Sequence, residues 1–324
     1  MTVLVTGGAG YIGAFVVRAL REAGHRPVVV DDLSTGHASA VPDGVRFERV
    51  SCGETEAVAR LMREERVDGV VHLAALSLVG ESVRDPGRYW ARNVGQAAGL
   101  LDACRIAGVR RFVLSSTAAV YGEPERVPID EDHPTRPTNP YGATKRAIEQ
   151  MLGHFRDAAG IGWVSLRYFN AAGAAPDGSL GEAHDPETHL VPIAVRAALR
   201  GEPRLTVFGD DYPTPDGTCL RDYVHVIDLA DAHVRALDWL AAHPGEGLVC
   251  NLGGGRGTSV LEVIDAVGRI TGRPVPHEIG PRRAGDPSVL VASVERAREQ
   301  LGWTPARSSI DEIVSDAVRW HARS

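Results

Sequence analysis

Lysine is nearly absent from this sequence of 324 residues. Arginine supplies almost all of the basic charge, and Lys145 is the only lysine. Acidic residues outnumber basic ones by 42 to 35, and the formal net charge is −7. This balance excludes the general attraction to nucleic acids and anionic membranes that a basic surface provides. A single lysine in so arginine-rich a chain is a candidate for a chemical role.

Cysteines and long apolar runs are also scarce. Cys52, Cys104, Cys219 and Cys250 lie far apart, so they form neither a CxxC pair nor a short disulfide framework. Reduced thiols in a cytosolic protein are the simplest interpretation. No apolar stretch approaches the roughly 18 residues of a membrane span, and the opening MTVLVTGG does not resemble a secretory signal. We expect a cytoplasmic protein with no membrane or nucleic-acid partner.

The first half of the chain alternates short apolar runs with helical patterns. This alternation is typical of βαβ units and predicts a doubly wound parallel sheet of the Rossmann type over residues 1–170. The predicted strands are Val3–Val5, Pro27–Val30, Val67–Leu73, Arg111–Ser115 and Trp163–Tyr168, and the predicted helices are Tyr11–Ala23, Asn93–Ala107 and Tyr141–Phe155.

The character of the chain changes after Asn170. Loops become long and rich in proline, glycine and aspartate, and helical patterns are fewer. We predict a smaller α+β substrate-binding domain over residues 171–324, with a soft boundary across which some segments return to the sheet. Its predicted helices are Val191–Leu199, Val226–Leu240, Val260–Thr271 and Ile310–Ala322.

A glycine-rich loop follows the first predicted strand. Gly7, Gly10 and Gly13 are spaced to give a tight turn, close approach to a pyrophosphate, and close packing of helix on strand. The following helix N-terminus favours phosphate. Asp31 ends the next strand, eighteen positions after Gly13, close to the spacing of a ribose-binding carboxylate. Because Asp31 repels a 2′-phosphate and the adjacent DLSTGH has no arginine, the loop predicts NAD rather than NADP.

A tyrosine and the lone lysine form the candidate reacting pair. Tyr141 and Lys145 lie four residues apart, on one face of a predicted helix. A free tyrosine has a pKa of about 10. A nearby ammonium and a positively charged nicotinamide would lower the pKa of Tyr141 toward neutrality, as a base requires. Thr117, at the end of a predicted strand, offers a hydroxyl to the same substrate oxygen.

These motifs carry a family resemblance. TGGAGYIG, SSTAAVYG, YxxxK and RYFN occur here in the order typical of extended short-chain dehydrogenases/reductases. HLAALSLVGESV, DDYPTPDGTCLRDYVHVIDLADAH, CNLGGG and PRRAGD resemble the UDP-glucose 4-epimerase family within that group, over essentially the whole chain. The resemblance implies reversible C4 epimerisation of UDP-glucose and UDP-galactose through a 4-keto intermediate, with transient hydride transfer to bound NAD. It also implies a homodimer.

The resemblance implies roles for individual residues. The catalytic set is Thr117, Tyr141 and Lys145. The implied NAD contacts lie in the glycine loop and at strand ends: Gly7, Gly10, Tyr11, Ile12, Gly13, Asp31, Leu33, Ser34, Thr35, Gly36, Ser51, Cys52, Leu73, Ala74, Ala75, Ser77, Asn93, Ser115, Tyr141, Lys145 and Tyr168. The implied UDP-sugar contacts are Thr117, Asn170, His189, Leu190, Thr206, Phe208, Arg221, Arg283, Asp286 and Leu290.

Three positions depart from the family pattern or leave it ambiguous. Ser51 stands where the family usually has an aspartate for the adenine amino group, and Ser77 where some members have a lysine near the pyrophosphate. Ser51 brings no negative charge and Ser77 brings no positive charge, so both substitutions affect the predicted affinity for NAD. Leu290 stands at the position that gates the C2 substituent of the sugar, and a leucine there does not choose between a hexose and an N-acetylhexosamine.

Other functions remain in competition. The same UDP site would serve an epimerase of a UDP-N-acetylhexosamine or a UDP-pentose. A related dehydratase needs an Asp-Glu pair after the strand-end threonine, where this chain has Ala118 and Ala119. A non-catalytic NAD-sensing protein should have lost Tyr141 or Lys145, and both are present.

One stretch resembles a metal site. His184 and His189 flank Asp185-Pro186-Glu187-Thr188, but they are not an i, i+4 pair and Pro186 opposes a helix. We therefore expect no metal.

Overall fold

The computed structural model describes residues 1–201, 204–283 and 286–323. Its largest feature is a seven-stranded sheet in the order β10-β6-β5-β4-β1-β2-β3, in which every neighbouring pair is parallel. The strands are β1 (Thr2–Thr6), β2 (Arg26–Val30), β3 (Arg46–Glu48), β4 (Gly69–His72), β5 (Arg111–Thr117), β6 (Gly162–Tyr168) and β10 (Gly247–Leu252). The predicted Rossmann-type sheet is confirmed.

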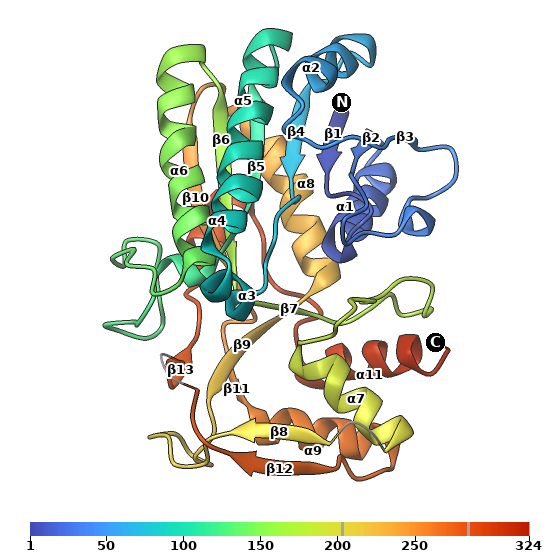
Figure 1. The fold of residues 1–324 in the computed structure, drawn as a ribbon, viewed down its shortest axis with the longest axis vertical. Helices are drawn as coiled ribbons and strands as arrows, with labels where there is room; N and C mark the ends of the chain where they lie inside the picture. Colours follow the sequence, from blue (N-terminus) through green and yellow to red (C-terminus); the bar gives the residue numbers. More distant parts are fainter. Residues whose placement is uncertain (202–203, 284–285, 324) are drawn as a thin grey trace.

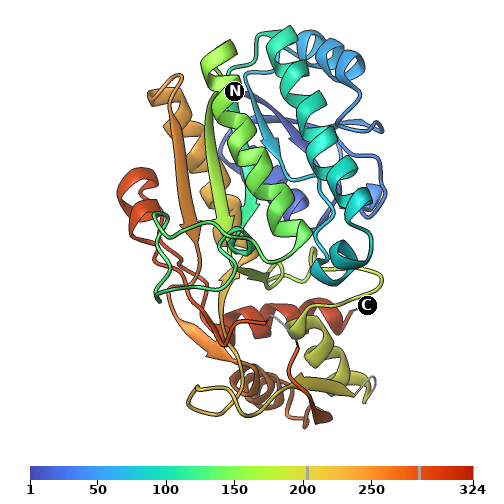
Figure 2. The same ribbon diagram turned by 60° about the vertical axis from the view of Figure 1, so that its left-hand side comes forward.

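Helices cover both faces of this sheet (Figures 1 and 2). One face carries α2 (Thr55–Glu64), α5 (Gln96–Ala107) and α6 (Pro140–Ala159), and the other carries α1 (Tyr11–Glu22) and α8 (Val226–Ala242). The valines of β1 and β2 are fully buried between these layers. Continuous apolar strands are what a sheet covered on both faces requires.

The chain order of the sheet reverses between β1 and β4. The strand β1 lies between β2 and β4, and the chain moves outward to β3 on one side and to β6 and β10 on the other. At such a reversal the connections leave in opposite directions, so a crevice opens at the carboxyl ends of the strands. The glycine loop and Thr117, at the ends of β1 and β5, both lie at this edge.

A smaller region lies below that edge in Figure 1. Here β7 (Asn170–Ala172), β9 (Leu220–His225), β11 (Gly257–Ser259) and β13 (Val289–Leu290) form one sheet, and β8 (Leu205–Phe208) pairs with β12 (His277–Gly280). Three helices, α7 (Leu190–Arg200), α9 (Val260–Thr271) and α11 (Ile310–His321), share a second apolar core. A further helix of the second half, α10 (Glu295–Leu301), packs on α8 and β10 of the large sheet layer.

Two segments beyond residue 170 join the large sheet. The strand β10 pairs with β6 along its whole length, and α8 packs on α1. The first and second halves of the chain are therefore interleaved in space. The division of the chain at residue 170 stays a prediction.

The helix predicted over Asn93–Ala107 differs in its first turns. Short helices α3 (Val79–Arg84) and α4 (Pro86–Tyr89) lead into a π-helical segment, η2 (Trp90–Gly95), before α5 begins. The Asn93 side chain accepts from Leu76 N at 2.8 Å and donates to Leu76 O at 3.0 Å and to Thr144 Oγ1 at 3.1 Å. Single π turns commonly aim a side chain at a functional site, and this one fixes the loop after β4.

The three-residue 3₁₀ turns η1 (Ala38–Ala40) and η3 (Ala118–Val120) complete the regular structure. Within the described ranges we find no helix with the length and hydrophobicity needed to cross a membrane.

Candidate active site

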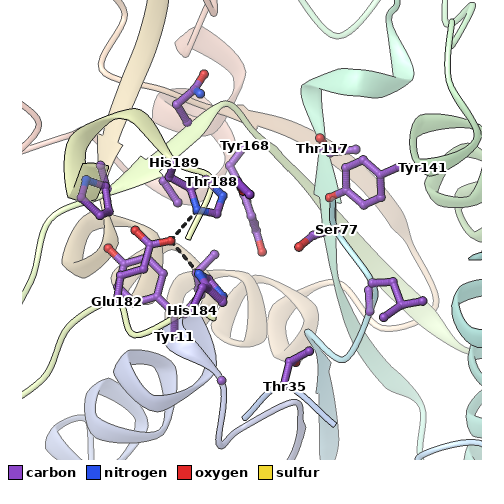
Figure 3. Close-up of a pocket in the computed structure, with 18 of the residues that line it drawn as sticks. Tyr11, Thr35, Ser77, Thr117, Tyr141, Tyr168, Glu182, His184, Thr188 and His189 are labelled. Carbon is purple, nitrogen blue, oxygen red and sulfur yellow. Dashed lines mark hydrogen bonds and ion pairs between the residues drawn. The ribbon is translucent and has the colours of Figure 1, made fainter. Parts of the chain in front are cut away.

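A cavity of about 740 Å³ lies between the carboxyl edge of the large sheet and the smaller region. Its walls come from the ends of β1, β4, β5 and β6 on one side and from α7, β8 and β9 on the other. Figure 3 shows side chains from both sides pointing into it. A deep cavity at the chain reversal of a doubly wound sheet is where such folds bind ligands.

The glycine loop forms a cradle that larger residues would fill. A Cβ on Gly13 would lie 2.0 Å from Gly7 O, and one on Gly7 would lie 2.6 Å from Ala74 N. Gly7 also has a φ of +73°, in the left-handed region that favours glycine. The loop runs directly into α1 at Tyr11, so the free N–H groups of that helix face the cavity. The cradle fits a pyrophosphate.

Asp31 follows β2 and lines the cavity together with the glycine loop. Its carboxylate accepts from Ala9 N at 3.0 Å and from Leu33 N at 2.8 Å, and burial raises its pKa. Folding brings Arg92 to the same wall, which spacing in the sequence did not indicate. The Arg92 guanidinium lies 2.6 Å from Asp32, so a neighbouring carboxylate already pairs with that cation.

Thr117, Tyr141 and Lys145 all line the cavity at the carboxyl edge of the large sheet, and Figure 3 shows Thr117 and Tyr141 side by side. Asn139 caps α6 by accepting from Gly142 N at 2.9 Å, and Pro140 opens the helix. This cap places Tyr141 and Lys145 on the first two turns, facing the end of β5. Lys145 is 2% exposed, and its Nζ donates to Ser115 O at 2.8 Å.

The pKa of Tyr141 moves against the sequence-based expectation. Burial raises the pKa of Tyr141 to about 12, although a hydrogen bond with Thr117 acts in the opposite direction. Burial also lowers the pKa of Lys145 to about 8, against the charge of Glu149. The protein's own groups therefore favour the neutral phenol. An oxidised nicotinamide bound above Tyr141 would add positive charge and lower the pKa of Tyr141.

Most residues implied by the resemblance line this single cavity. They are Gly7, Gly10, Tyr11, Ile12, Gly13, Asp31, Ser34, Thr35, Cys52, Leu73, Ala74, Ala75, Ser77, Ser115, Thr117, Tyr141, Lys145, Tyr168, Asn170, His189, Leu190, Thr206, Phe208, Arg221, Arg283 and Asp286. The set spans both halves of the chain. Tyr168 forms a hydrogen bond with Ser115, which fixes the Tyr168 ring in the cavity wall.

Five implied residues lie outside the lining, as far as the described residues define it: Leu33, Gly36, Ser51, Asn93 and Leu290. Asn93 hydrogen-bonds the backbone of Leu76, and Leu76 lines the cavity. Gly36 packs on the Ala9 backbone, where a Cβ would come within 2.9 Å. Leu290 packs beside a small apolar cluster with Tyr121 and Phe169.

The other end of the cavity carries arginines and an aromatic ring. Arg221 is paired with Asp286 at 2.5 Å, and its side chain is 12% exposed. The Arg283 guanidinium lies over the Phe208 ring, 3.9 Å from its centroid. Two guanidinium groups held by neighbouring side chains suit a diphosphate, which they bind by charge-assisted hydrogen bonds.

Several lining residues were absent from the sequence-based set. Besides Asp32 and Arg92, they include Glu182 and His184, which lie in the loop before α7. Burial acts to raise the pKa of Glu182, yet His184 and His189 lower it to about 2. Burial acts to lower the pKa of His189, yet Glu182 and Glu187 raise it to about 10. Only the HDPETH stretch signalled this cluster.

Comparison with known proteins identifies the family. Residues 3–253 match the model described as the NAD dependent epimerase/dehydratase family. The chain belongs to this family. A UDP-glucose 4-epimerase of Streptomyces lividans is 52% identical over 98% of this chain and 95% of its own length.

Solved structures of the family extend the comparison. The UDP-glucose 4-epimerase of Brucella ovis in complex with NAD has a TM-score of 0.95 and 48% identity, and the match covers 98% of this chain and 97% of that one. The enzyme of Bifidobacterium longum in complex with NAD⁺ and UDP has a TM-score of 0.93 and 36% identity, over 100% and 99% of the two chains. The predicted family resemblance is therefore confirmed.

Proposed function

We propose that this chain catalyses the reversible C4 epimerisation of a UDP-hexose, with UDP-glucose and UDP-galactose as the pair and NAD as the bound cofactor. The observation that carries the proposal is one continuous cavity that joins the glycine cradle, the Thr117–Tyr141–Lys145 set and the arginine-lined end. Oxidation and reduction at one carbon require cofactor, base and sugar to be held together. The NAD- and UDP-bound relatives support the same pairing of ligands.

The residues of the chain would share the proton transfer. The glycine cradle and Asp31 would hold NAD, which would supply reversible hydride transfer at C4 of the sugar without net oxidation. Tyr141, as phenolate, accepts the proton of the 4-hydroxyl and gives it back, while Thr117 holds the same oxygen. With a pKa of about 8, Lys145 stays positively charged at pH 7 and favours the phenolate.

Inversion requires that the 4-keto sugar present its other face between the two hydride transfers. The UDP part would stay fixed by Arg221 and Arg283, and Phe208 would pack on the uracil. The sugar then turns about its bond to the diphosphate inside the cavity. Ala118 and Ala119 follow Thr117 directly, in η3, and offer no acid or base. Loss of water from the keto-sugar is therefore not supported.

The test gives the purified protein UDP-galactose and, separately, UDP-N-acetylgalactosamine, with the C4 epimers followed by NMR. We expect UDP-galactose to be converted to UDP-glucose. Turnover of the N-acetyl sugar alone would move the assignment to the hexosamine, and turnover of a UDP-pentose in preference to both would move it to the pentose. No turnover at high enzyme concentration would overturn the epimerase.

We also propose that the chain works as a homodimer in the cytoplasm. Val79, Val83 and Trp90, on α3 and η2, are 45%, 61% and 45% exposed, an apolar surface suited to a second copy. The four cysteines are free and buried, which suits a reducing compartment. Light scattering should show a dimer that Val83→Glu converts to a monomer. Val127→Glu, at a valine that is 44% exposed in the loop between η3 and α6, should leave it dimeric. A monomeric parent protein would contradict the dimer.

A further inference from the structure

Four potential metal ligands meet in the loop before α7. Glu182, His184, Glu187 and His189 each offer one ligand atom, and these atoms all lie within 4.8 Å of one another. Two imidazole nitrogens and two carboxylate oxygens thus converge on a volume the size of a single ion. The loop has no helical i, i+4 pair, so this convergence comes from the fold of the loop.

The contacts within the cluster are close. His184 Nδ1 and His189 Nδ1 lie 2.8 Å and 2.7 Å from Glu182 Oε1, and His189 Nδ1 lies 2.9 Å from Glu187 Oε1. Figure 3 shows both imidazoles turned toward the Glu182 carboxylate. The Glu182 and Glu187 side chains are only 5% and 3% exposed. A cation shared by two buried carboxylates so near one another stabilises both, and a metal ion or a protonated imidazole can supply that charge.

One oxygen of the cluster lacks a hydrogen-bond donor. Glu187 Oε2 is buried, and no group in the described part of the chain hydrogen-bonds to it. The Arg196 guanidinium is 3.9 Å away, within ion-pair range but beyond hydrogen-bond range. A buried carboxylate oxygen without a donor is costly, so it is a second, independent sign that this side chain serves a ligand.

The backbone of the loop is held from outside the cluster. Trp320 Nε1, on α11, donates to Glu182 O at 2.8 Å, and His37 Nε2 lies 3.2 Å from Ala183 O. The start of the cluster is therefore positioned by neighbouring elements before any ion is bound. Such preorganisation lowers the entropic cost of collecting four ligands.

We propose that Glu182, His184, Glu187 and His189 bind one divalent transition-metal ion, with zinc the best match. Zinc takes four histidine and carboxylate ligands in tetrahedral sites, and two carboxylates balance its charge. A tetrahedral shell complete in protein ligands makes the site structural. It would fix the loop that delivers His189 and Leu190 to the cavity, leaving Nε2 of His189 available to a substrate.

The proposed metal site is also linked to the glycine cradle. The His184 ring packs edge-on against Tyr11, at 6.3 Å between centroids, and the Tyr11 hydroxyl donates to Gly173 O at 2.6 Å. Tyr11 opens the helix that follows the glycine cradle. The loop that carries the four potential ligands therefore contacts the helix that follows the glycine cradle, through His184 and Tyr11.

The first test is metal content. The full-length, untagged protein is stripped with a chelator, incubated with zinc chloride, desalted and analysed for zinc by mass spectrometry. We expect about one zinc ion per chain and a higher thermal midpoint with zinc present. Zinc at the background level, with no thermal shift, would mean that the four side chains form only hydrogen bonds and ion pairs with one another. That result would overturn the proposal.

Variants locate the ion. The His184→Gln/Glu187→Gln double variant should lose the zinc, whereas His277→Gln, at an exposed histidine of β12, should keep it. Retention of zinc by the double variant would place the metal elsewhere and overturn the assignment. Cobalt(II) bound to the unmodified protein gives a readout that does not depend on a variant folding. We expect the intense visible absorption of a tetrahedral site, and an octahedral spectrum would contradict the proposed geometry.

Discussion

Tyr141 and Lys145 lie one helical turn apart, and burial shifts both away from the charged state. The pKa of Tyr141 rises to about 12 and that of Lys145 falls to about 8. The base is therefore neutral until further positive charge arrives above it. This arrangement would link proton abstraction to the oxidised form of the cofactor, because only that form carries the charge.

We predict that Tyr141→Phe lowers kcat by about 10²- to 10⁴-fold, the usual loss for a general base. NAD should stay bound, because the phenyl ring keeps the wall of the cavity intact. The measurement is turnover of UDP-galactose together with the cofactor content of the purified variant. Tyr212→Phe is the matched control, since Tyr212 is buried outside the described lining of the cavity. Full activity of Tyr141→Phe would refute the base assignment.

At the scale of elements, the π turn of η2 holds the loop after β4 in place. Asn93 accepts from and donates to the Leu76 backbone, and Leu76 lies in the wall of the cavity. The sequence resemblance implied an NAD contact for Asn93. The geometry gives it an indirect action, through the loop it anchors.

Asn93→Ala leaves both the N–H and the C=O of Leu76 without their partner. We predict that it weakens NAD binding by about 5- to 150-fold, which corresponds to about 1–3 kcal/mol, the cost of an unpaired buried polar group. Thr144→Val is the comparison, because it removes the 3.1 Å bond to Asn93 and leaves both Leu76 bonds in place. Its effect on NAD binding should be smaller. Calorimetric titration with NAD checks both, and equal losses would refute the role of the Leu76 bonds.

A buried ion pair joins α6 to the sheet beneath the reacting groups. Arg167, on β6, lies 2.6 Å from Glu149, on α6, and both side chains are less than a tenth exposed. Ser116 and Ser165 each donate to the same carboxylate at 2.7 Å. The helix that carries Tyr141 is thus fixed in register against β5 and β6.

We predict that Arg167→Met lowers the free energy of unfolding by about 3–5 kcal/mol, because Glu149 would be left as an uncompensated buried charge. Arg156→Met, at an exposed pair with Asp157, should change it by less than about 0.5 kcal/mol. Urea unfolding measures both. Adding Glu149→Gln to Arg167→Met should recover part of the loss, and a further additive loss would contradict this account.

At the scale of the whole molecule, acid stability depends on histidines buried without charge. His72 and His233 are fully buried, and burial lowers the pKa of His72 to about 3 and that of His233 to about 4. In the unfolded chain histidine titrates near about 6.5. Below about pH 6.5 the unfolded state therefore binds more protons than the folded state. The free energy of unfolding consequently decreases as the pH falls below that value.

We predict that the free energy of unfolding decreases between about pH 6.5 and pH 4, with each histidine adding up to about 1.4 kcal/mol per pH unit. Urea titrations at several pH values measure the slope. His233→Gln should reduce that slope, because glutamine does not titrate. An unchanged slope in this variant would show that His233 is not a source of the acid sensitivity.

Most of the first half was predictable because its signals are local. Gly7, Gly10 and Gly13, the valine runs and the Tyr141–Lys145 spacing each act within a few residues. Some of the elements that escaped prediction carry weak signals. The strands β3 and β11 have three residues each, and the Asn93 side chain of η2 is held by Leu76 and Thr144, which are distant in the sequence. Arg92 and Glu182 reached the cavity through contacts that no local pattern encodes.

By itself the sequence indicated the parallel sheet and the cofactor class through glycine spacing and helical periodicity, and the family through motifs spread over the whole chain. Its assignment of Tyr141 and Lys145 as the reacting pair stays a prediction. Only the tertiary structure decided what depends on distant chain segments meeting. Burial raises the pKa of Tyr141 above its usual value, the Asn93 side chain bonds the Leu76 backbone behind the cavity wall, and one loop brings together four potential metal ligands although their spacing had argued against a metal site. Such properties depend on packing, because side chains lose water and distant residues come into contact only when the chain has folded.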